Sequence, residues 1–423
     1  MKVRAGRTQT AIPNPTMRTV PSLFRRVLSR PVLWWAIALV WLVRDVAGNL
    51  GPAGRPDAFS VLQAGGRWLH DPAAIYADTA KHLAQTGLVP VIGLLRPPVA
   101  AMLAAPFTLL PSSWQIPVWT TLDALAAVIG LFFLQRCFAR TSYERAVFWA
   151  VAFYFPPLYA EINAGQIGGF VLLPACLALT TRRSRALFAG VLVGAAASMK
   201  LYPALMVIGA RLRWRPFLTG SIVTGGLLTL IACIPLGPSG TWQYVTGVLL
   251  PALRAPNPDC AQTSVATLFG RSIGGDAYPI INSSGGITIL QSPLHLPLLA
   301  SILTALVLAL ALGGSIAAAK ASGWNRPYGL ALGLALGALL PGELNPYQYL
   351  PLLPLVLMVI VTSLQKGNGM RLAVLAVGLV FWLRQPCLLP FPNVWTIGAL
   401  ILFATCVLAA HDFRETKEAP TQA

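Results

Sequence analysis

The chain has 423 residues, of which 56% are hydrophobic and only 10% are charged, and its net charge is +18. A water-soluble domain carries roughly 25% charged residues, so this composition excludes an ordinary soluble protein. The Lys and Arg residues form short clusters between apolar stretches and no long basic stripe, which argues against nucleic-acid binding.

Long apolar runs predict membrane-spanning helices. Only helices and closed barrels satisfy their backbone groups within lipid, and barrel strands alternate apolar and polar residues. Stretches such as Leu298 to Ala319 are continuously apolar, which indicates helices. The first span is expected from Leu33 to Leu50, after a basic tail over residues 1–32. Because no small-x-small cleavage site follows it, we expect an uncleaved anchor.

A single transmembrane domain is expected over residues 33–410, between the basic tail and a polar tail over residues 411–423. About 20 apolar residues cross a bilayer, and a helical hairpin at Ala186 to Ala210, broken near Lys200, counts as two spans. The sequence thus predicts an all-α bundle of about twelve spans. The other spans are expected near Gln115–Gln135, Arg145–Ile162, Ile167–Thr181, Pro216–Leu236, Pro297–Ala319, Pro327–Leu340, Tyr349–Leu364, Arg371–Leu383 and Val394–Ala410.

The placement of basic residues predicts the orientation. With both termini in the cytoplasm, 22 of the 31 Lys and Arg fall on the cytoplasmic side, as the positive-inside rule requires. Large outer loops then cover residues 51–114 and 237–296, and the short apolar stretch from Pro97 to Pro111 is expected as a helix in the outer interface. We expect a multi-pass protein of the plasma (inner) membrane with its site on the outer face.

Polar residues from distant parts of the chain fall on that outer side. Ionisable groups near lipid are costly and usually face a bundle interior or a wet cavity, so their convergence indicates one site. Acids together with cations suit a sugar donor carried on a lipid phosphate, because cations bind the phosphate and a carboxylate accepts the proton of the attacking hydroxyl. The residues are Asp57, Arg96, Glu161, Asn163, Gln166, Lys200, Arg271, Glu343 and Arg384.

Ordinary roles compete with these assignments. An Asp after a span is commonly a helix N-cap, a Lys or Arg at a helix end reaches the headgroups, and Tyr residues such as Tyr202 and Tyr347 occupy the interfacial aromatic belt. The histidines and cysteines lack metal-ligand spacing, so neither a metal nor a cofactor is expected. Cys260 and Cys387 are the two cysteines in outer loops, and their pairing stays open.

Five motifs, taken in order, resemble glycosyltransferase family 87, a GT-C-class family of integral membrane proteins. They are Asp57-Ala58-Phe59 with Ala64 to Leu69 and Ile75-Tyr76, Arg96-Pro97-Pro98 with Pro106 and Leu110-Pro111, Asn163-Ala164-Gly165-Gln166, Gly190 through Lys200-Leu201-Tyr202-Pro203 to the Arg211–Arg215 cluster, and Gln262 to Val265 with Arg271. The Trp-x-His that family members often carry near the span at Tyr349 is absent, because Glu343 to Tyr349 contains no histidine.

The resemblance implies an inverting hexosyltransferase, expected to be a mannosyltransferase, that uses a polyprenyl-phosphate sugar and a lipid or glycan acceptor. It implies Asp57 as the general base and Lys200, Arg96 and Arg271 as phosphate ligands. The residues expected to bind substrate, from the resemblance and from their predicted outer-face position together, are Gln166, Asn163, Glu161, Tyr202, Glu343, Tyr347 and Arg384. A transporter or flippase of a lipid-linked sugar is the main alternative, although only one broken hairpin is visible and transporters usually repeat theirs. A structural membrane subunit without a site is the second.

Overall fold

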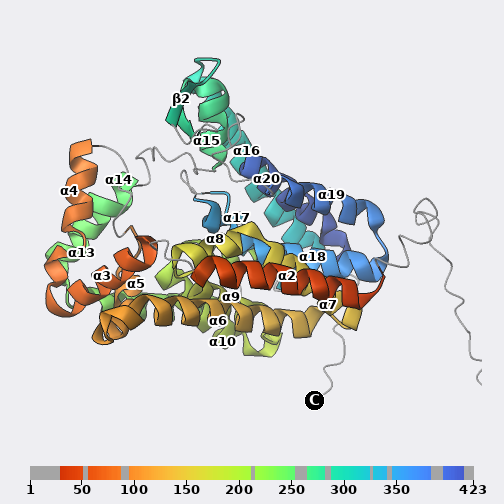
Figure 1. Cartoon of the computed structure of the whole chain (residues 1–423), viewed down its shortest axis with the longest axis horizontal. Coiled ribbons are helices and arrows are strands. Elements are labelled where there is room, and N and C mark those ends of the chain that lie inside the picture. Colours follow the sequence, from red (N-terminus) through yellow and green to blue (C-terminus); the bar gives the residue numbers. More distant parts are fainter. Residues whose placement is uncertain are drawn as a thin grey trace, which may run out of the picture.

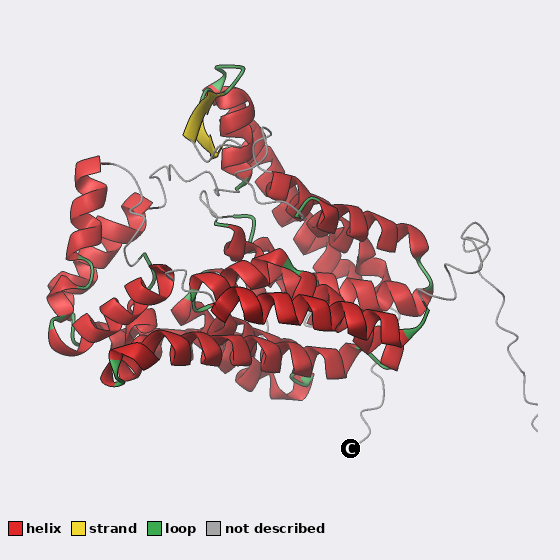
Figure 2. Cartoon of the chain, viewed as in Figure 1, coloured by secondary structure: helices red, strands yellow, loops and turns green. Residues whose placement is uncertain are grey.

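The computed structural model describes residues 29–50, 56–86, 95–210, 215–252, 264–281, 287–323, 327–340, 345–382 and 394–413. These residues form a mainly helical molecule with one small β-hairpin (Figures 1 and 2). The helices are α2 (Pro31–Leu50), α3 (Pro56–His70), α4 (Ala77–Thr86), α5 (Pro98–Ala104), α6 (Ser112–Phe138), α7 (Ser142–Tyr154), α8 (Pro156–Ala164), α9 (Gly168–Thr180), α10 (Ala186–Met199), α11 (Met206–Gly209), α12 (Arg215–Cys233), α13 (Gly237–Gln243), α14 (Leu250–Ala252), α15 (Val265–Phe269), α16 (Pro297–Ser322), α17 (Pro327–Leu336), α18 (Leu353–Lys366), α19 (Gly369–Val380) and α20 (Val394–Leu408).

Shorter helical segments join them. Those that matter below are η3 (Ala105–Leu109), η5 (Tyr202–Leu205), η6 (Tyr244–Leu249), η7 (Gly270–Gly274) and η8 (Pro346–Leu352).

Five helical stretches of the described chain are long and apolar enough to cross a membrane. They are Ser112–Phe138, Arg215–Cys233, Pro297–Ser322, Tyr347–Lys366 and Val394–Phe413. Several helices present large apolar side chains outward, for example Leu298 and Leu310 of α16 and Ile222 of α12. In water such surfaces would be strongly unfavourable, whereas in lipid they are not. The chain is therefore a polytopic, mainly helical membrane protein, while the expected total of about twelve spans stays a prediction.

One expected span is divided in the structure, and another is present as a short helix. The span expected from Arg145 to Ile162 is two helices, α7 and α8, because Pro156 and Pro157 follow Phe155 and a residue before proline is disfavoured in helical geometry. α9 has only 13 residues. At 1.5 Å per residue it is about 20 Å long, which is shorter than the roughly 30 Å hydrocarbon core. The bundle thus contains broken and partial helices as well as full-length ones.

The expected hairpin over Ala186 to Ala210 is present as α10, η5 and the short α11, with Lys200 at the bend. Helices α10 and α12 approach closely along small residues. A Cβ atom at Gly190 would lie 2.0 Å from the carbonyl oxygen of Phe217, and one at Gly220 would lie 2.3 Å from that of Leu187. Small residues permit such contact between helices in lipid, where burial of apolar surface drives little association.

The two outer loops expected from the sequence contain regular structure. The stretch from Pro97 to Pro111 forms α5 and η3, and its residues Val99 to Ala101 are buried by neighbouring helices. In the second loop, β1 (Ala277–Ile281) pairs antiparallel with β2 (Ile287–Gln291), so that Ala277 lies opposite Gln291. The hairpin was not expected from an all-α prediction. Its Ile- and Thr-containing strands are short runs with β propensity, which a search for long apolar stretches passes over.

Two ends of the bundle can be distinguished. At one end Gln365 donates hydrogen bonds to the carbonyl oxygen of Phe138 and to Glu144 (both 3.0 Å), and Lys366 pairs with Asp412 (3.2 Å). The other end, toward α3, is on the left side of Figure 1. Helix α6 extends from one end to the other, and its 27 residues make it about 40 Å long. The polar groups at the α3 end are therefore well separated from those around Gln365 and Lys366.

Candidate active site

Asp57 occupies the first turn of α3. Its side chain is 24% exposed, and its Oδ1 lies 3.9 Å from the guanidinium of Arg96. Its neighbour Ala58 is fully buried against Gly165, the turn between α8 and α9. The carboxylate is therefore held on a fixed helix and still reaches solvent, as a group that exchanges a proton must.

Arg96 is positioned by its backbone and by its side chain. The hydroxyl of Tyr76 donates a hydrogen bond of 2.9 Å to the Arg96 carbonyl oxygen. Burial raises the pKa of Tyr76 well above its ordinary value, so this hydroxyl stays protonated and remains a donor. The guanidinium donates to Oε1 of Gln166 and has only 13% of its side chain exposed. Arg96 thus joins the α3 carboxylate to the α8–α9 turn.

The α8–α9 turn is fixed by specific contacts. Gly165 has φ 68°, a left-handed conformation that favours glycine, and its carbonyl oxygen accepts a 3.0 Å hydrogen bond from the Trp119 indole. Asp123 of α6 accepts a 3.0 Å hydrogen bond from the Phe170 amide, in the first turn of α9. Carboxylates are favourable at helix N-termini, where free amides point outward. Gln166 is therefore presented by a turn that is held from α6.

Glu161 and Lys200 form a buried ion pair. Their atoms Oε1 and Nζ are 3.2 Å apart, and the two side chains are 1% and 12% exposed. Glu161 Oε1 also accepts a hydrogen bond from the Gly168 amide. Lys200 Nζ lies 6.0 Å from the ring centroid of Tyr202 and 5.8 Å from that of Tyr347. The ammonium is thus enclosed by a carboxylate and two aromatic rings.

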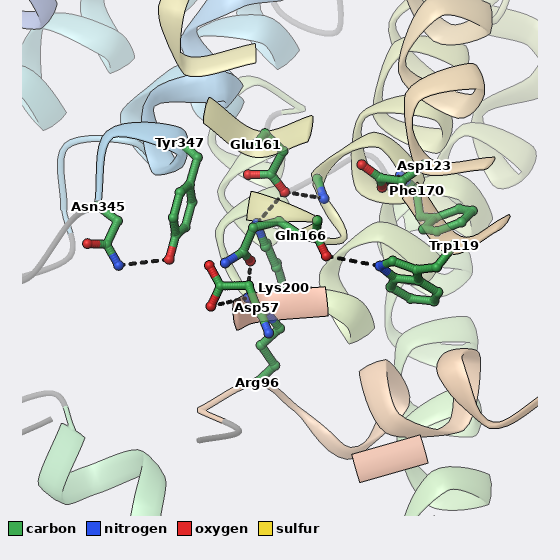
Figure 3. Close-up of polar contacts among 12 residues, drawn as sticks. Asp57, Arg96, Trp119, Asp123, Glu161, Gln166, Phe170, Lys200, Asn345 and Tyr347 are labelled. Atoms are coloured by element: carbon green, nitrogen blue, oxygen red, sulfur yellow. Dashed lines mark hydrogen bonds and ion pairs between the residues drawn. The ribbon is translucent and has the colours of Figure 1, made fainter. Parts of the chain in front are cut away.

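Tyr347, in η8, completes the group from the C-terminal part of the chain. Its hydroxyl oxygen accepts a 2.7 Å hydrogen bond from the amide nitrogen of Asn345. Because an amide nitrogen is only a donor, the proton of the Tyr347 hydroxyl is not used in this bond. Figure 3 shows the Tyr347 hydroxyl on the side toward which Asp57 and Gln166 point.

The structure brings together seven of the expected residues: Asp57, Arg96, Glu161, Gln166, Lys200, Tyr202 and Tyr347. Figure 3 shows all of them except Tyr202. Asn163 lies on α8 between Glu161 and Gln166 and is partly exposed. Arg271 is buried in η7, between α15 and the β-hairpin. Glu343, Arg384, Cys260 and Cys387 lie outside the described residues. Within the described ranges, no three His, Cys, Asp or Glu side chains gather to bind a metal ion.

Three supporting residues were missed from the sequence. Trp119 resembled any aromatic residue of a span, and Asn345 any polar loop residue. Asp123 gave a usable signal, since an acid in the middle of the apolar stretch Gln115 to Gln135 is a candidate functional residue by its cost alone.

Comparison with known proteins identifies the family. The model of Glycosyltransferase family 87 matches residues 95–344, which is more than half of the chain. The chain belongs to glycosyltransferase family 87. The matched region contains Arg96, Glu161, Gln166 and Lys200. Tyr347 lies just after its end, and Asp57 lies well before its start. A membrane glycosyltransferase is therefore established as the class of this protein.

One curated relative is a polyprenol-phosphate-mannose-dependent alpha-(1-2)-phosphatidylinositol pentamannoside mannosyltransferase from Mycobacterium tuberculosis (strain CDC 1551 / Oshkosh). It is 29% identical over 203 residues, which cover 46% of this family 87 chain and 46% of the relative. The chain thus matches less than half the length of that relative. No solved structure matches the chain.

Proposed function

We propose that this family 87 protein transfers a hexose, mannose, from a polyprenyl-phosphate carrier to a lipid or glycan acceptor on the outer face of the plasma membrane. The observation that carries the proposal is the Asp57 carboxylate 3.9 Å from the Arg96 guanidinium, next to the Glu161–Lys200 pair. A potential proton acceptor and two cations then lie within one polar group, as transfer from a phosphate-activated sugar requires.

Asp57 acts as the general base in this proposal. The acceptor hydroxyl gives its proton to Asp57, and its oxygen forms a bond to C1 of the sugar. The bond from C1 to the phosphate oxygen breaks, and its electron pair stays on the leaving phosphate. A single base opposite the leaving group gives inversion at C1, as in inverting glycosidases.

Arg96 and Lys200 act as the phosphate ligands. Arg96 has five N–H donors in a planar fork that matches two phosphate oxygens, and its contacts to Asp57 and Gln166 leave several of them available. Lys200 has three donors, of which one faces Glu161. Arg271 stays a weaker prediction for this role. Asn163, Tyr202 and Tyr347 are proposed to contact substrate, and Glu343 and Arg384 stay predictions from the sequence.

Mannose is supported by the relative, whose name gives polyprenol-phosphate-mannose as its donor. Its acceptor, a phosphatidylinositol mannoside, supports a lipid-linked glycan as the kind of acceptor here. The outer-face site and the cytoplasmic termini rest on the distribution of Lys and Arg.

The test uses purified protein in lipid, radiolabelled polyprenyl-phosphate-mannose and a lipid and glycan extract. We expect label to enter a new product with the wild type and with Asp71→Asn, a matched change at an exposed Asp one residue after α3. Asp57→Asn should reduce transfer by at least about 100-fold, since general-base catalysis contributes roughly that much or more. Retained activity in Asp57→Asn would remove Asp57 as the base. Movement of intact donor between leaflets without transfer would favour the flippase.

A further inference from the structure

Two polar atoms in the candidate site are buried without a hydrogen-bond partner. They are Oε2 of Glu161 and Nε2 of Gln166, and the third such side-chain atom among the described residues, Oγ of Ser363, lies in α18. Both Glu161 and Gln166 are fully buried. Native proteins pair nearly all buried polar groups, because an unpaired one loses its hydration without compensation. Two such atoms on one turn therefore need an explanation.

The contacts of the partner atoms fix what each free atom can do. Arg96 carries only N–H donors, so the Gln166 atom facing it is the oxygen, and Nε2 is left as a donor. Lys200 and the Gly168 amide both donate to Oε1 of Glu161, so Oε2 is left as an acceptor. The turn thus presents one unused donor and one unused acceptor.

The two side chains are held in place by their own turn. The backbone N–H of Gln166 donates a 3.2 Å hydrogen bond to the backbone carbonyl oxygen of Glu161. Gly165, between these two residues, caps the C-terminus of α8. A Cβ atom at Gly168 would lie 2.2 Å from Oε1 of Glu161, so only glycine leaves room for this carboxylate. In Figure 3 the side chain of Gln166 lies between those of Glu161 and Asp57. Rotation of either group to find another partner is therefore restricted.

We propose that Glu161 Oε2 and Gln166 Nε2 bind hydroxyl groups of the transferred hexose. A hydroxyl both donates and accepts, so it satisfies both atoms, at one ring carbon or at two adjacent ones. A phosphate oxygen would be repelled by the carboxylate, and an ammonium group would find no acceptor at Nε2. This inference rests on the proposed function and assigns its sugar-recognition residues.

Access to the pair requires neighbouring side chains to move. Both free atoms are covered in this arrangement, and Arg96 contacts Gln166 on the side of Asp57. Arg96 turns its unused N–H groups to the donor phosphate and keeps its hydrogen bond to Oε1 of Gln166, while the sugar hydroxyl enters at Nε2. Sugar and phosphate are in this way bound together.

The experiment compares polyprenyl-phosphate-mannose with its 2-, 3-, 4- and 6-deoxy analogues, in a binding assay and in transfer. For the wild type we expect one analogue, or two deoxygenated at adjacent carbons, to lose about 100-fold or more in both affinity and kcat/KM, because a site built for a hydroxyl leaves its own groups unpaired without it. The other analogues should stay within about 10-fold of the parent.

Two isosteric variants reverse the polarity of the pair. In Gln166→Glu the Nε2 position becomes an acceptor while Arg96 keeps its oxygen. In Glu161→Gln the new amide oxygen faces Lys200 and Gly168, so the Oε2 position becomes a donor. Each variant should reduce the preference for the parent donor over the affected deoxy analogue to less than about 10-fold. The ratios for the other deoxy analogues should stay unchanged. The double variant again presents one donor and one acceptor, with their places exchanged. It should recover part of the preference for the parent donor over the deoxy analogue. Gln85→Glu, at an exposed position of α4, is the matched control.

The outcomes separate this inference from the proposed function. Discrimination in binding without any transfer would support the hydroxyl site and contradict the proposed transfer of mannose. Transfer that is equally efficient with all deoxy donors, or single variants that slow every donor alike, would overturn the hydroxyl site and leave the transferase standing. Absence of donor binding by the wild type would overturn both. Thermal unfolding of each variant in lipid excludes a loss of fold as the cause.

Discussion

At the scale of single residues, the candidate site is a compensated set of charges. Asp57 faces Arg96, and Glu161 faces Lys200, so each proposed phosphate ligand already has an acidic neighbour. A buried ion pair contributes little net stability, but removal of one partner leaves an uncompensated charge. Function and stability are therefore coupled at these positions, and a loss of activity alone does not assign a role.

Lys200→Met tests this coupling. The variant should lose donor affinity and, with Glu161 left buried opposite an apolar chain, should also lose roughly 3 kcal/mol of stability. Adding Glu161→Gln should restore much of the stability without restoring donor binding. Thermal unfolding and donor binding, measured on both variants, check this. If the double variant also regained donor affinity, Lys200 would be a structural residue only.

Tyr347→Phe removes one hydroxyl and keeps the ring beside Lys200. Because a single hydrogen bond contributes about 1 kcal/mol, we expect kcat/KM for transfer to fall about 5- to 10-fold with little change in thermal stability. Tyr154→Phe is the matched control, because the Tyr154 hydroxyl donates a 3.0 Å hydrogen bond to the Leu379 carbonyl oxygen, away from the site. Unchanged transfer in Tyr347→Phe would remove its hydroxyl from the substrate contacts.

At the scale of helices and turns, the site depends on where helices stop. Lys200 follows the last residue of α10, Glu161 and Gln166 flank the end of α8, and Asp57 lies in the first turn of α3. The prolines, glycines and basic clusters of the sequence predicted most of these ends. The division of the expected span Arg145–Ile162 into α7 and α8 was not predicted, because hydropathy measures the length of an apolar run and not the helix break that Pro156 introduces within it.

Gly165→Ala tests the α8–α9 turn. The left-handed backbone disfavours alanine, and its Cβ would lie 2.5 Å from that of Ala58, the neighbour of Asp57. We expect a loss of stability of at least about 1 kcal/mol and reduced transfer, because α3 is displaced. Gly226→Ala in α12, where a Cβ meets nothing within 4 Å, should leave both unchanged or slightly improve stability. Equal behaviour of the two variants would contradict the role of the turn.

At the scale of the whole molecule, the sequence predicted a helical membrane protein. It also predicted that polar residues from separate segments meet at one end of the helical bundle. Asp57, Arg96, Gln166 and Lys200 could be grouped because each adjoins the end of an apolar stretch on the same predicted side. Their pairing could not be derived, since which carboxylate meets which cation depends on packing such as the contact of α3 with Gly165. The number of spans also stays open, because α9 and similar short helices need a neighbour to complete the crossing.

Cysteine labelling tests the orientation of the bundle. Gln85→Cys, on the exposed face of α4, should react with an impermeant maleimide in intact cells, whereas Ser184→Cys, in the basic segment before α10, should react only after permeabilisation. Background from the native cysteines is measured on the parent protein. The reverse pattern would place the Asp57 end of the bundle in the cytoplasm.

The contact between Lys200 and the Tyr347 ring has a consequence for how the protein is made. A chain emerging from the ribosome holds Asp57, Glu161 and Lys200 long before η8 and α18 have been synthesised. Glu161 and Lys200 both belong to the N-terminal half of the chain. That half can therefore fold in the membrane with this ion pair already formed. The site is completed only when the segment that contains Tyr347 has been synthesised and has packed beside Lys200, which is near the end of translation.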